Sequence, residues 1–464
     1  MPEKKSEVDY DSVDLPSGLL AALADEFSAK VTRLERHVAR REAWVIDLQR
    51  DDGSILEGFL RIDRAPQAGS TVSLRREADI CRELQPLGIP VPALLSWNEE
   101  FHAALFDRVP GRADIHNLKD ASQQRKIMED FIDIIARLHQ VDANSLSADL
   151  GAKPDTPARC ALDDVDRQLA QFGSFVDSYV DPLMSYGIQW LRRHAPEKVD
   201  RVCLVQGDTG PVNFMFEGDK VSAVVDWEWG HWGDPMEDLG NICVREFWNP
   251  SGGLSGLFKR YEQASGIPYS RFAAQYYRIQ QNVRGMIPIH AMCQHPIPSQ
   301  SYAWYLCYRY LGDRSTCEAL ADAMDIPITR PTMPDEGKHG LLAKATMAHL
   351  RVDVKPALNT AFSESRVDDV AILVECMDRE QRFGDQFKRI ECEEISQLLN
   401  NKLAGQAKID CFEDAMSALN KAILDEILDD AELIPYLARK AYRDEWLYWP
   451  VTRLYPDRSW SALD

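Results

Sequence analysis

The stretches LVQGDTGPVNFMF (residues 204–216) and VSAVVDWEWGHWGDPMEDL (residues 221–239) decide the fold of this chain of 464 residues. Each begins with a short apolar run, which predicts a buried strand, and continues into a polar turn. Asp208 and Asn213 follow the first strand, and the second strand ends at Asp226. Two adjacent strand ends would bring these three side chains into one cleft.

Three oxygen-bearing side chains in one cleft suit phosphoryl transfer. That reaction needs a carboxylate to orient and deprotonate the acceptor hydroxyl, and hard oxygen ligands to hold Mg²⁺ across the phosphates. We predict Asp208 as the catalytic base and Asn213 and Asp226 as metal ligands. The alternative is that these residues only form turns, but their combined spacing, closed by GDPMEDL at residues 233–239, argues against it.

This pattern resembles the Brenner-type motif of the aminoglycoside phosphotransferase and choline kinase family, H-G-D-x-x-x-x-N followed by a hydrophobic strand and D-W/F-E. The resemblance covers about residues 20–325. It implies the same roles for Asp208, Asn213 and Asp226. It also implies that Glu228 assists the metal site and that Asp238, in the D-P-x-x-D-L element, supports the catalytic loop.

Gln206 stands where this family usually has histidine. Glutamine can also donate and accept hydrogen bonds, so we expect activity to be retained, and we place Gln206 with the cofactor-binding residues. A chain that had lost phosphoryl transfer would more readily have lost Asp208.

The nucleotide side of such a site needs a strand cation on the α- and β-phosphates, positioned by a carboxylate of a neighbouring helix. Arg61 and Glu77 are the candidates, and Arg64 is the rival cation. The alternative for Arg61 is an exposed strand cation without a ligand, and the alternative for Glu77 is a solvated helix residue. The segment DRVPG, residues 107–111, resembles the hinge between lobes, where the backbone near Arg108 and Val109 would meet adenine.

The loop expected to cover the phosphates, HVARREAW at residues 37–44, contains no glycine, whereas the family usually carries glycine and serine there. A loop without glycine does not favour close approach of its backbone to the phosphates. The charge of Arg40 or Arg41 could compensate.

The resemblance implies an α+β, bilobal protein-kinase-like fold, with a small antiparallel-sheet N-lobe and a mainly helical C-lobe, to which the chain adds a C-terminal all-α domain. Hydrophobic spacing agrees. In the N-lobe we predict a helix over 19–36, strands over 44–48 and 56–62, a helix over 72–87, and strands over 93–97 and 103–109. The expected divisions are a nucleotide-binding lobe at 16–110, a catalytic and substrate lobe at 111–325, a linker at 326–338 and a helical accessory domain at 339–464.

Bulk properties exclude several classes of protein. The formal net charge of -21 disfavours nucleic acid or an anionic membrane surface as partner. We find no signal sequence and no apolar run of about 18 residues, and the ten scattered cysteines suit reduced, buried thiols. A cytoplasmic protein without a membrane partner is expected. The C-terminal helices could support a homo-oligomer.

The acceptor is less well defined. Arg278, Arg284, His290 and His295 suit an anionic or acyl-type acceptor better than an aminoglycoside. The motif L-R-x-x-x-x-P at residues 60–66 and the region after Gly340 resemble hydroxyacyl-CoA kinases of the subfamily associated with acyl-CoA dehydrogenases. The C-terminal region could equally be a packing module without chemistry.

We therefore expect an ATP- and Mg²⁺-dependent kinase for a hydroxyl-bearing small molecule, with a hydroxyacyl-CoA preferred. An aminoglycoside, macrolide or choline-like amino alcohol is the alternative acceptor. Two other classes of function stay open. One is a non-catalytic pseudokinase scaffold, and the other is a metal-dependent hydrolase that uses the same carboxylates.

Overall fold

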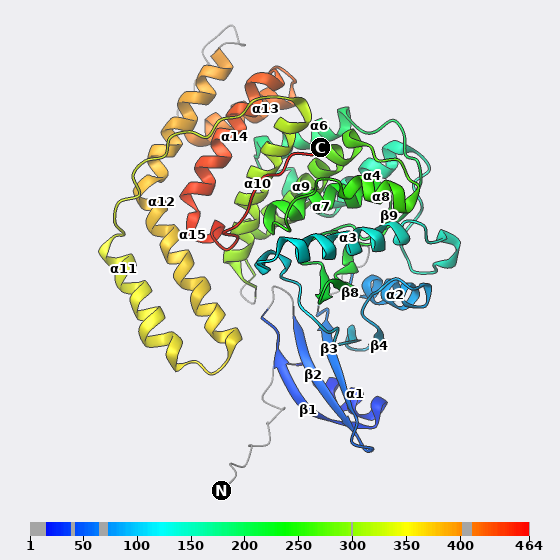
Figure 1. Cartoon of the computed structure of the whole chain (residues 1–464). Helices are drawn as coiled ribbons and strands as arrows, with labels where there is room; N and C mark the ends of the chain where they lie inside the picture. Colours follow the sequence, from blue (N-terminus) through cyan, green and yellow to red (C-terminus); the bar gives the residue numbers. More distant parts are fainter. Residues whose placement is uncertain (1–14, 39–41, 65–72, 298–299, 401–410, 464) are drawn as a thin grey trace.

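The protein consists of a small sheet lobe, a larger helical lobe and a C-terminal helical region (Figure 1), in a computed structural model. The structure describes residues 15–38, 42–64, 73–297, 300–400 and 411–463. This two-lobed α+β arrangement with additional C-terminal helices is the one predicted from the sequence. The sheet lobe lies at one end of the molecule, and the helices make up the rest.

The N-lobe is built on a five-stranded antiparallel sheet with the strand order β1-β2-β3-β5-β4. Its strands are β1 (Ala29–Arg36), β2 (Ala43–Arg50), β3 (Ile55–Ile62), β4 (Leu94–Asn98) and β5 (Ala103–Asp107). Helix α1 (Leu19–Phe27) packs on it through the buried Leu19 and Leu23. Helix α2 (Leu74–Leu84) is capped by Ser73, whose side chain accepts a hydrogen bond from Arg76 N–H.

The helix predicted over residues 19–36 is wrong in its second half. It ends at Phe27 because Ser28 adopts a left-handed conformation with φ 48°, and residues 29–36 form β1. The β-branched Val31 and Thr32 favour a strand. Antiparallel pairing of β1 with β2, from Ala29 opposite Arg50 onward, overrides the helical spacing of the apolar residues.

The two lobes are joined directly after β5. Arg112 and Phe216 exchange backbone hydrogen bonds of 3.0 and 2.8 Å, which ties the connection to the C-lobe. Gly111 has φ +101°, and a Cβ atom there would lie 2.2 Å from the carbonyl oxygen of Phe216. Only glycine fits this position.

The C-lobe is mainly helical, with two short two-stranded antiparallel sheets that carry the predicted site. Strand β6 (Cys203–Val205) pairs with β9 (His231–Gly233), and β7 (Phe214–Glu217) pairs with β8 (Lys220–Val224). Its helices are α3 (Ala121–Leu138), α4 (Pro157–Gln171), α5 (Gly173–Val176), α6 (Pro182–Arg193), α7 (Pro235–Trp248), α8 (Leu257–Ser265), α9 (Arg271–Gln294) and α10 (Tyr302–Met324).

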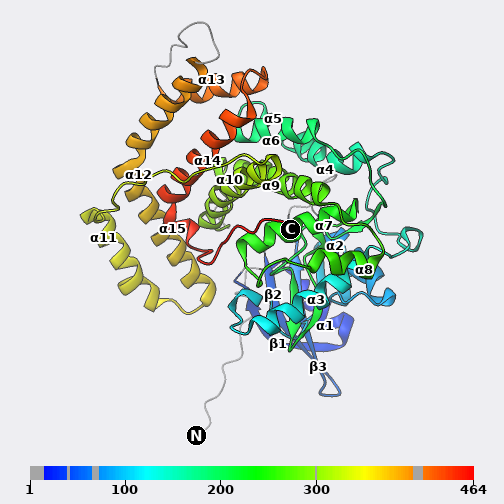
Figure 2. The same cartoon turned by 45° about the horizontal axis from the view of Figure 1, so that its top comes forward.

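The C-terminal region shares its hydrophobic core with the C-lobe. It contains α11 (Leu341–Ala348), a π-helical turn (His349–Val354), α12 (Ala361–Asn400), α13 (Phe412–Leu424), α14 (Asp430–Leu447) and α15 (Trp449–Thr452). Helix α13 packs on α6, and α14 packs on α10. Leu419 and Leu437 belong to the same buried cluster as Trp190 of the C-lobe. Figure 2 shows α12, α13 and α14 along one side of the C-lobe.

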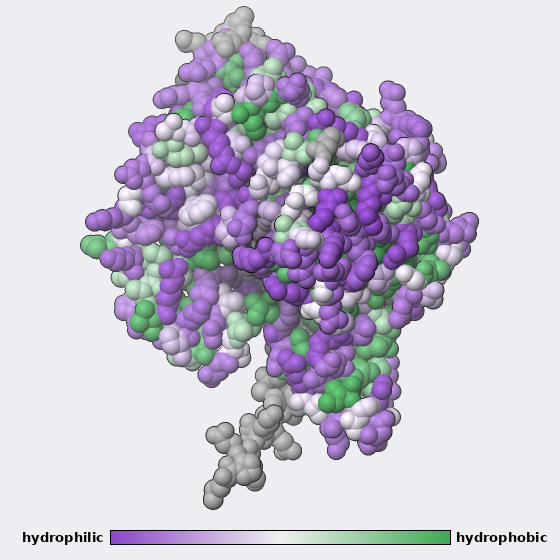
Figure 3. Space-filling view, in the orientation of Figure 1, coloured by the Kyte–Doolittle hydropathy of each residue, from purple (hydrophilic) through white to green (hydrophobic). Residues whose placement is uncertain are grey.

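Hydrophilic side chains cover most of the face seen in Figure 3, and the hydrophobic ones are scattered among them. Within the part of the chain that the structure describes, no helix combines the length and the apolar character that a membrane span requires.

Candidate active site

The predicted catalytic loop follows β6 and lies over α7. Gly207 has φ +83°, and a Cβ atom there would lie 2.4 Å from the carbonyl oxygen of Trp229. The loop therefore packs directly against the segment that follows β8, and glycine is required for this contact. Asn213 ends the loop, and its backbone carbonyl accepts from Val225 N–H at 3.0 Å. The two strand ends named in the sequence thus lie side by side.

Gln206 connects the two strand ends from beneath. Its amide nitrogen donates to the backbone carbonyls of Val225 (3.0 Å) and Asp226 (2.7 Å), while its carbonyl oxygen accepts from Asp208 N–H (2.8 Å) and from the Thr209 hydroxyl (3.2 Å). The side chain is fully buried. It has no exposed surface with which to meet a nucleotide, so the geometry favours a positioning role instead of the predicted cofactor contact.

Asp238 holds the start of the catalytic loop, as the family resemblance implied. Its carboxylate accepts from the backbone N–H groups of Gln206 and Gly207, both at 3.0 Å, and from the Thr209 hydroxyl. His139 lies 3.0 Å from the same carboxylate. Burial alone would raise the pKa of Asp238, but the His139 hydrogen bond and the other donors lower it below its usual value.

The carboxylate of Asp208 accepts hydrogen bonds from three side chains. Asn213 donates its amide to Oδ2 at 3.0 Å, and Gln281 donates to Oδ1 at 3.2 Å. Arg245 approaches with both Nε, 2.9 Å from Oδ1, and Nη2, which contacts Oδ2. Because the Asn213 amide nitrogen faces Asp208, its carbonyl oxygen is the end left for a metal.

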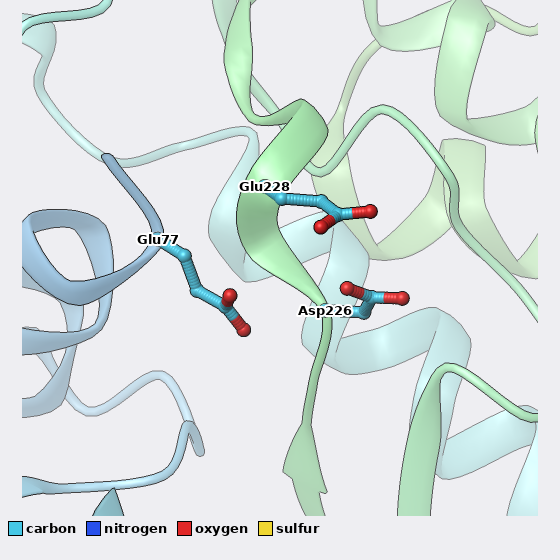
Figure 4. Close-up of side chains that lie close together, drawn as sticks. All are labelled: Glu77, Asp226 and Glu228. Atoms are coloured by element: carbon cyan, nitrogen blue, oxygen red, sulfur yellow. The ribbon is translucent and has the colours of Figure 1, made fainter. Parts of the chain in front are cut away.

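Arg61, Glu77, Asp226 and Glu228 form a second cluster beside the loop. Arg61 Nη1 lies 2.5 Å from Glu77 and 3.7 Å from Asp226, and Nη2 lies 3.5 Å from Glu228. The three carboxylates offer oxygens within 4.8 Å of one another. Figure 4 shows Glu77 reaching from α2 toward the segment that carries Asp226 and Glu228.

This cluster fits a divalent cation. Carboxylate oxygens are the ligands that Mg²⁺ prefers, and three acidic side chains meet here. Asp226 also adopts a left-handed conformation, φ 63° and ψ 60°, which is costly for a residue other than glycine. In this conformation the Asp226 carboxylate lies on the same side as Arg61, 3.7 Å from its Nη1. Glu77, which the sequence indicated only as a partner of the strand cation, lies among the candidate metal ligands.

The remaining nucleotide candidates lie at the edges of this cluster. Arg64 pairs with Glu42 at 2.5 and 2.8 Å, so Arg61 is the cation that faces the carboxylates. Arg108 pairs with Asp47 at 2.8 Å, and its backbone N–H donates to Glu57, where Val109 begins the connection between lobes. Arg40 and Arg41, predicted to compensate for the missing glycines, lie outside the described residues.

Three of the four side chains expected to suit an acyl-type acceptor lie in the core of the C-lobe. Arg278 and Arg284 are buried, and Arg284 pairs with Asp164 at 2.7 Å and Glu237 at 3.1 Å beneath the catalytic loop. His290 is buried between acidic side chains, whereas His295 is exposed. Arg278, Arg284 and His290 lie on the buried face of α9, where a charged side chain needs a hydrogen-bond or ion-pair partner.

Sequence reasoning missed Arg245 and Gln281, the two donors that join Asn213 on Asp208. A signal for Arg245 existed, because it follows Asp238 by seven residues on α7, which is two helical turns and hence the same helix face. Gln281 lies on α9, and no spacing relative to the motif pointed to it.

The sequence profile of the phosphotransferase enzyme family matches residues 31–276, more than half of the chain. The chain belongs to this family. The phosphotransferase profile runs from β1 into the first part of α9 and includes every residue of the two clusters except Gln281. The resemblance predicted from the motif is confirmed.

Two curated relatives of this phosphotransferase are acyl-CoA dehydrogenase family member 11 of Rattus norvegicus and member 10 of Mus musculus. The first is 26% identical over 206 residues, 42% of this chain and 26% of its own length. The second is 28% identical over 233 residues, 47% of this chain and 21% of its own length. The chain thus matches only about a quarter of these longer proteins. Their names agree with the predicted subfamily.

A crystal structure of a predicted aminoglycoside phosphotransferase from Ralstonia eutropha superimposes with a TM-score of 0.50 at 20% identity. The match covers 65% of this chain and 94% of the other. It shows that the two proteins share a fold, which confirms the predicted kinase-like architecture.

Proposed function

We propose that this phosphotransferase is an Mg²⁺- and ATP-dependent kinase that phosphorylates a hydroxyl of a small molecule, with Asp208 as catalytic base. One observation carries the proposal. Gln206 joins the loop of Asp208 directly to the backbone of Asp226, within a structure where Asp226 faces a strand arginine paired with Glu77. Phosphoryl transfer needs a base, carboxylates that can hold a metal ion and a cation that binds phosphate, and this arrangement provides all three.

The residues of the second cluster would bind the nucleotide. Arg61, positioned by Glu77, would hold the α- and β-phosphates, while the backbone near Arg108 and Val109 would meet adenine. Asn213, Asp226 and Glu228 would hold Mg²⁺, which when bound neutralises charge on the phosphates.

Asp208 would act on the acceptor. The hydroxyl oxygen attacks the γ-phosphorus, its proton passes to the Asp208 carboxylate, and the bond from the γ-phosphorus to the bridging oxygen breaks to release ADP. Asn213, with its amide on Asp208, fixes the orientation of the base. The products are a phosphate monoester and ADP.

A hydroxyacyl-CoA is the acceptor we favour. The names of the curated relatives support an acyl-CoA context. An aminoglycoside, macrolide or amino alcohol is the alternative, supported by the shared fold with a predicted aminoglycoside phosphotransferase. The region from residue 339 would then act as an accessory helical unit.

A non-catalytic scaffold is the second candidate, favoured by the state of Asp208. Arg245, Gln281 and Asn213 together direct four hydrogen bonds to its carboxylate. A carboxylate accepts about four, so the base is saturated before any acceptor arrives.

Calorimetric titration with Mg·ATP, followed by ADP production with a panel of hydroxyacyl-CoAs, amino alcohols and aminoglycosides, tests the proposal. A kinase binds Mg·ATP and forms ADP together with a phosphorylated acceptor identified by mass spectrometry. Binding of Mg·ATP without transfer to any acceptor supports the scaffold, and phosphate release without a phosphorylated acceptor supports a hydrolase.

A further inference from the structure

Arg245 reaches the catalytic base from α7, whereas the strand cation Arg61 comes from β3. It projects from the last turns of α7 and pairs with both oxygens of Asp208, its Nε at 2.9 Å from Oδ1. The side chains of Arg245 and Asp208 are 22% and 17% exposed, so both border space that solvent reaches. Arg61 instead contacts Glu77, Asp226 and Glu228. Arg245 thus pairs with the proposed base, and Arg61 pairs with the acidic side chains of the second cluster.

The acceptor hydroxyl must replace one of the donors on Asp208. A general base has to lie about 2.6–3.2 Å from the oxygen whose proton it takes, and four hydrogen bonds already occupy the carboxylate. The Gln281 contact, at 3.2 Å, is the longest of these. Gln281 is therefore the donor that the hydroxyl displaces most easily, which places the bound hydroxyl beside Arg245.

Arg245 keeps unused donors at this place. A guanidinium has five N–H groups, and Asp208 takes two of them. Among the residues that the structure describes, the other three have no hydrogen-bond partner. A planar fork of this kind recognises carboxylate and carbonyl oxygens and repels ammonium groups.

Aromatic rings lie near Arg245. Trp248, three residues after Arg245 on α7, packs edge-on against Tyr455 with ring centroids 5.0 Å apart. The C-terminal segment reaches this place because Ser459 N–H donates to the carbonyl of Phe247 at 3.0 Å. An acceptor held by Arg245 would thus have an apolar neighbour for its carbon chain.

We infer that Arg245 is the residue that selects the acceptor: it binds an acyl oxygen, of a carboxylate or a thioester, while the hydroxyl of the same molecule meets Asp208. This inference rests on the proposed kinase function. It excludes ammonium-bearing acceptors, because their charge would face the guanidinium. The acyl oxygen has two chemical sources, the free hydroxy acid and its coenzyme A thioester, and the experiment separates them.

The experiment compares wild type with Arg245→Met, Arg245→Lys and the control Arg260→Met. Arg260 forms a similar two-pronged pair with Asp133, at 2.8 and 2.7 Å, on the surface of α8. Hydroxybutyrate, hydroxybutyryl-CoA and choline are the probes. Binding is titrated calorimetrically without ATP, and KM is measured separately for acceptor and for ATP.

We expect Arg245→Met to weaken binding of an acyl probe roughly 10- to 100-fold, the loss typical of a hydrogen bond to a charged group. Arg245→Lys should retain part of the acyl-probe binding. KM for ATP should stay unchanged in both Arg245 variants, and Arg260→Met should behave as wild type. Comparison of hydroxybutyryl-CoA with hydroxybutyrate shows whether Arg245 can bind a thioester carbonyl or needs a free carboxylate.

Three results would overturn the inference: equal acyl-probe binding by wild type and Arg245→Met, no wild-type binding of either acyl probe, or a rise in KM for ATP with unchanged acceptor binding. The last would place Arg245 on the γ-phosphate. Failure of the proposed function is distinct, because Arg245-dependent binding of an acyl probe without ATP turnover would leave this inference standing and remove the kinase.

Discussion

The side-chain amide of Gln206 donates to the backbone carbonyl of Asp226 at 2.7 Å. This contact joins the loop that carries the proposed base to the turn that carries the proposed metal ligand. At its other end, Gln206 accepts from Asp208 N–H. One buried side chain thus positions both the proposed base and the proposed metal ligand, and it is Gln206 where the family usually has histidine.

Replacement of Gln206 should show how much the link contributes. Gln206→Ala leaves buried backbone groups unsatisfied, so we expect a loss of about 2–4 kcal/mol in the free energy of unfolding. Gln206→His should lose less, since one imidazole nitrogen can donate while the other accepts. Urea unfolding measures both. Equal stability of wild type and Gln206→Ala would show that the link is dispensable.

Asp208→Asn should abolish the proposed proton transfer without preventing nucleotide binding. General-base catalysis contributes about 10²–10⁴-fold, so kcat should fall by that factor while the Kd for Mg·ATP stays near wild type. Asp219→Asn is the matched control, because Asp219 pairs with Lys126 at 2.9 Å in the turn between β7 and β8, away from the cluster. Retained turnover in Asp208→Asn would assign the base to another residue.

Arg61 and Arg64 offer a direct comparison of the two rival cations. Arg61→Met removes the guanidinium that faces three carboxylates, and we expect KM for ATP to rise about 10-fold or more. Arg64→Met removes a guanidinium paired with Glu42, and KM for ATP should change less than twofold. Steady-state kinetics at fixed acceptor concentration measure both. A larger rise in KM for ATP in Arg64→Met than in Arg61→Met would assign the phosphate-binding role to Arg64.

The motif residues were predictable because short apolar runs leave little choice of conformation. Strand ends at Val205 and Val224 bring Asp208 and Asp226 together, and both ends followed from the sequence. The segment over 29–36 was not predictable in the same way. Its apolar spacing suits a helix, and the pairing with β2, which lies later in the chain, is what favours the strand over that helix.

The contacts that α9 makes with distant segments were the part of the site that the sequence could not indicate. Arg284 on α9 pairs with Asp164 on α4, 120 residues earlier. Gln281 reaches Asp208 across 73 residues. Helical spacing identifies which face of α9 is buried, but not which carboxylate meets it, because that depends on how α4, α7 and α9 pack.

The stability of the C-lobe should depend on pH through His290. Its Nε2 lies 3.1 Å from Asp313 and its Nδ1 lies 3.4 Å from Asp181. Burial alone would lower the pKa of His290, but these two carboxylates raise it above its usual value. A raised folded-state pKa means that the stabilisation is complete below about pH 6.5 and is lost as pH rises through the raised value.

His290→Gln provides the comparison. The difference in Tm between wild type and this variant should be largest near pH 6 and shrink toward pH 9, as measured by differential scanning fluorimetry. His194, which contacts only a backbone carbonyl and the Trp190 ring among the described residues, serves as control through His194→Gln. A difference in Tm that is independent of pH would contradict a charged His290.

The C-terminal region should melt together with the C-lobe. Leu419 of α13 is fully buried in a cluster that also contains Trp190 and Leu191 of α6. Leu419→Ala should therefore lower the free energy of unfolding of the whole C-lobe by about 2–5 kcal/mol, the cost of a buried leucine cavity. Leu342→Ala, at a side chain 87% exposed on α11, should change it by less than about 0.5 kcal/mol. Calorimetry with and without Mg·ATP decides the matter. If the two regions share one core, wild type and Leu419→Ala each show a single unfolding transition, and it lies at lower temperature in the variant. Two transitions would contradict this if Leu419→Ala shifts only the transition that Mg·ATP leaves unchanged. That result would show that residues 339–464 fold independently.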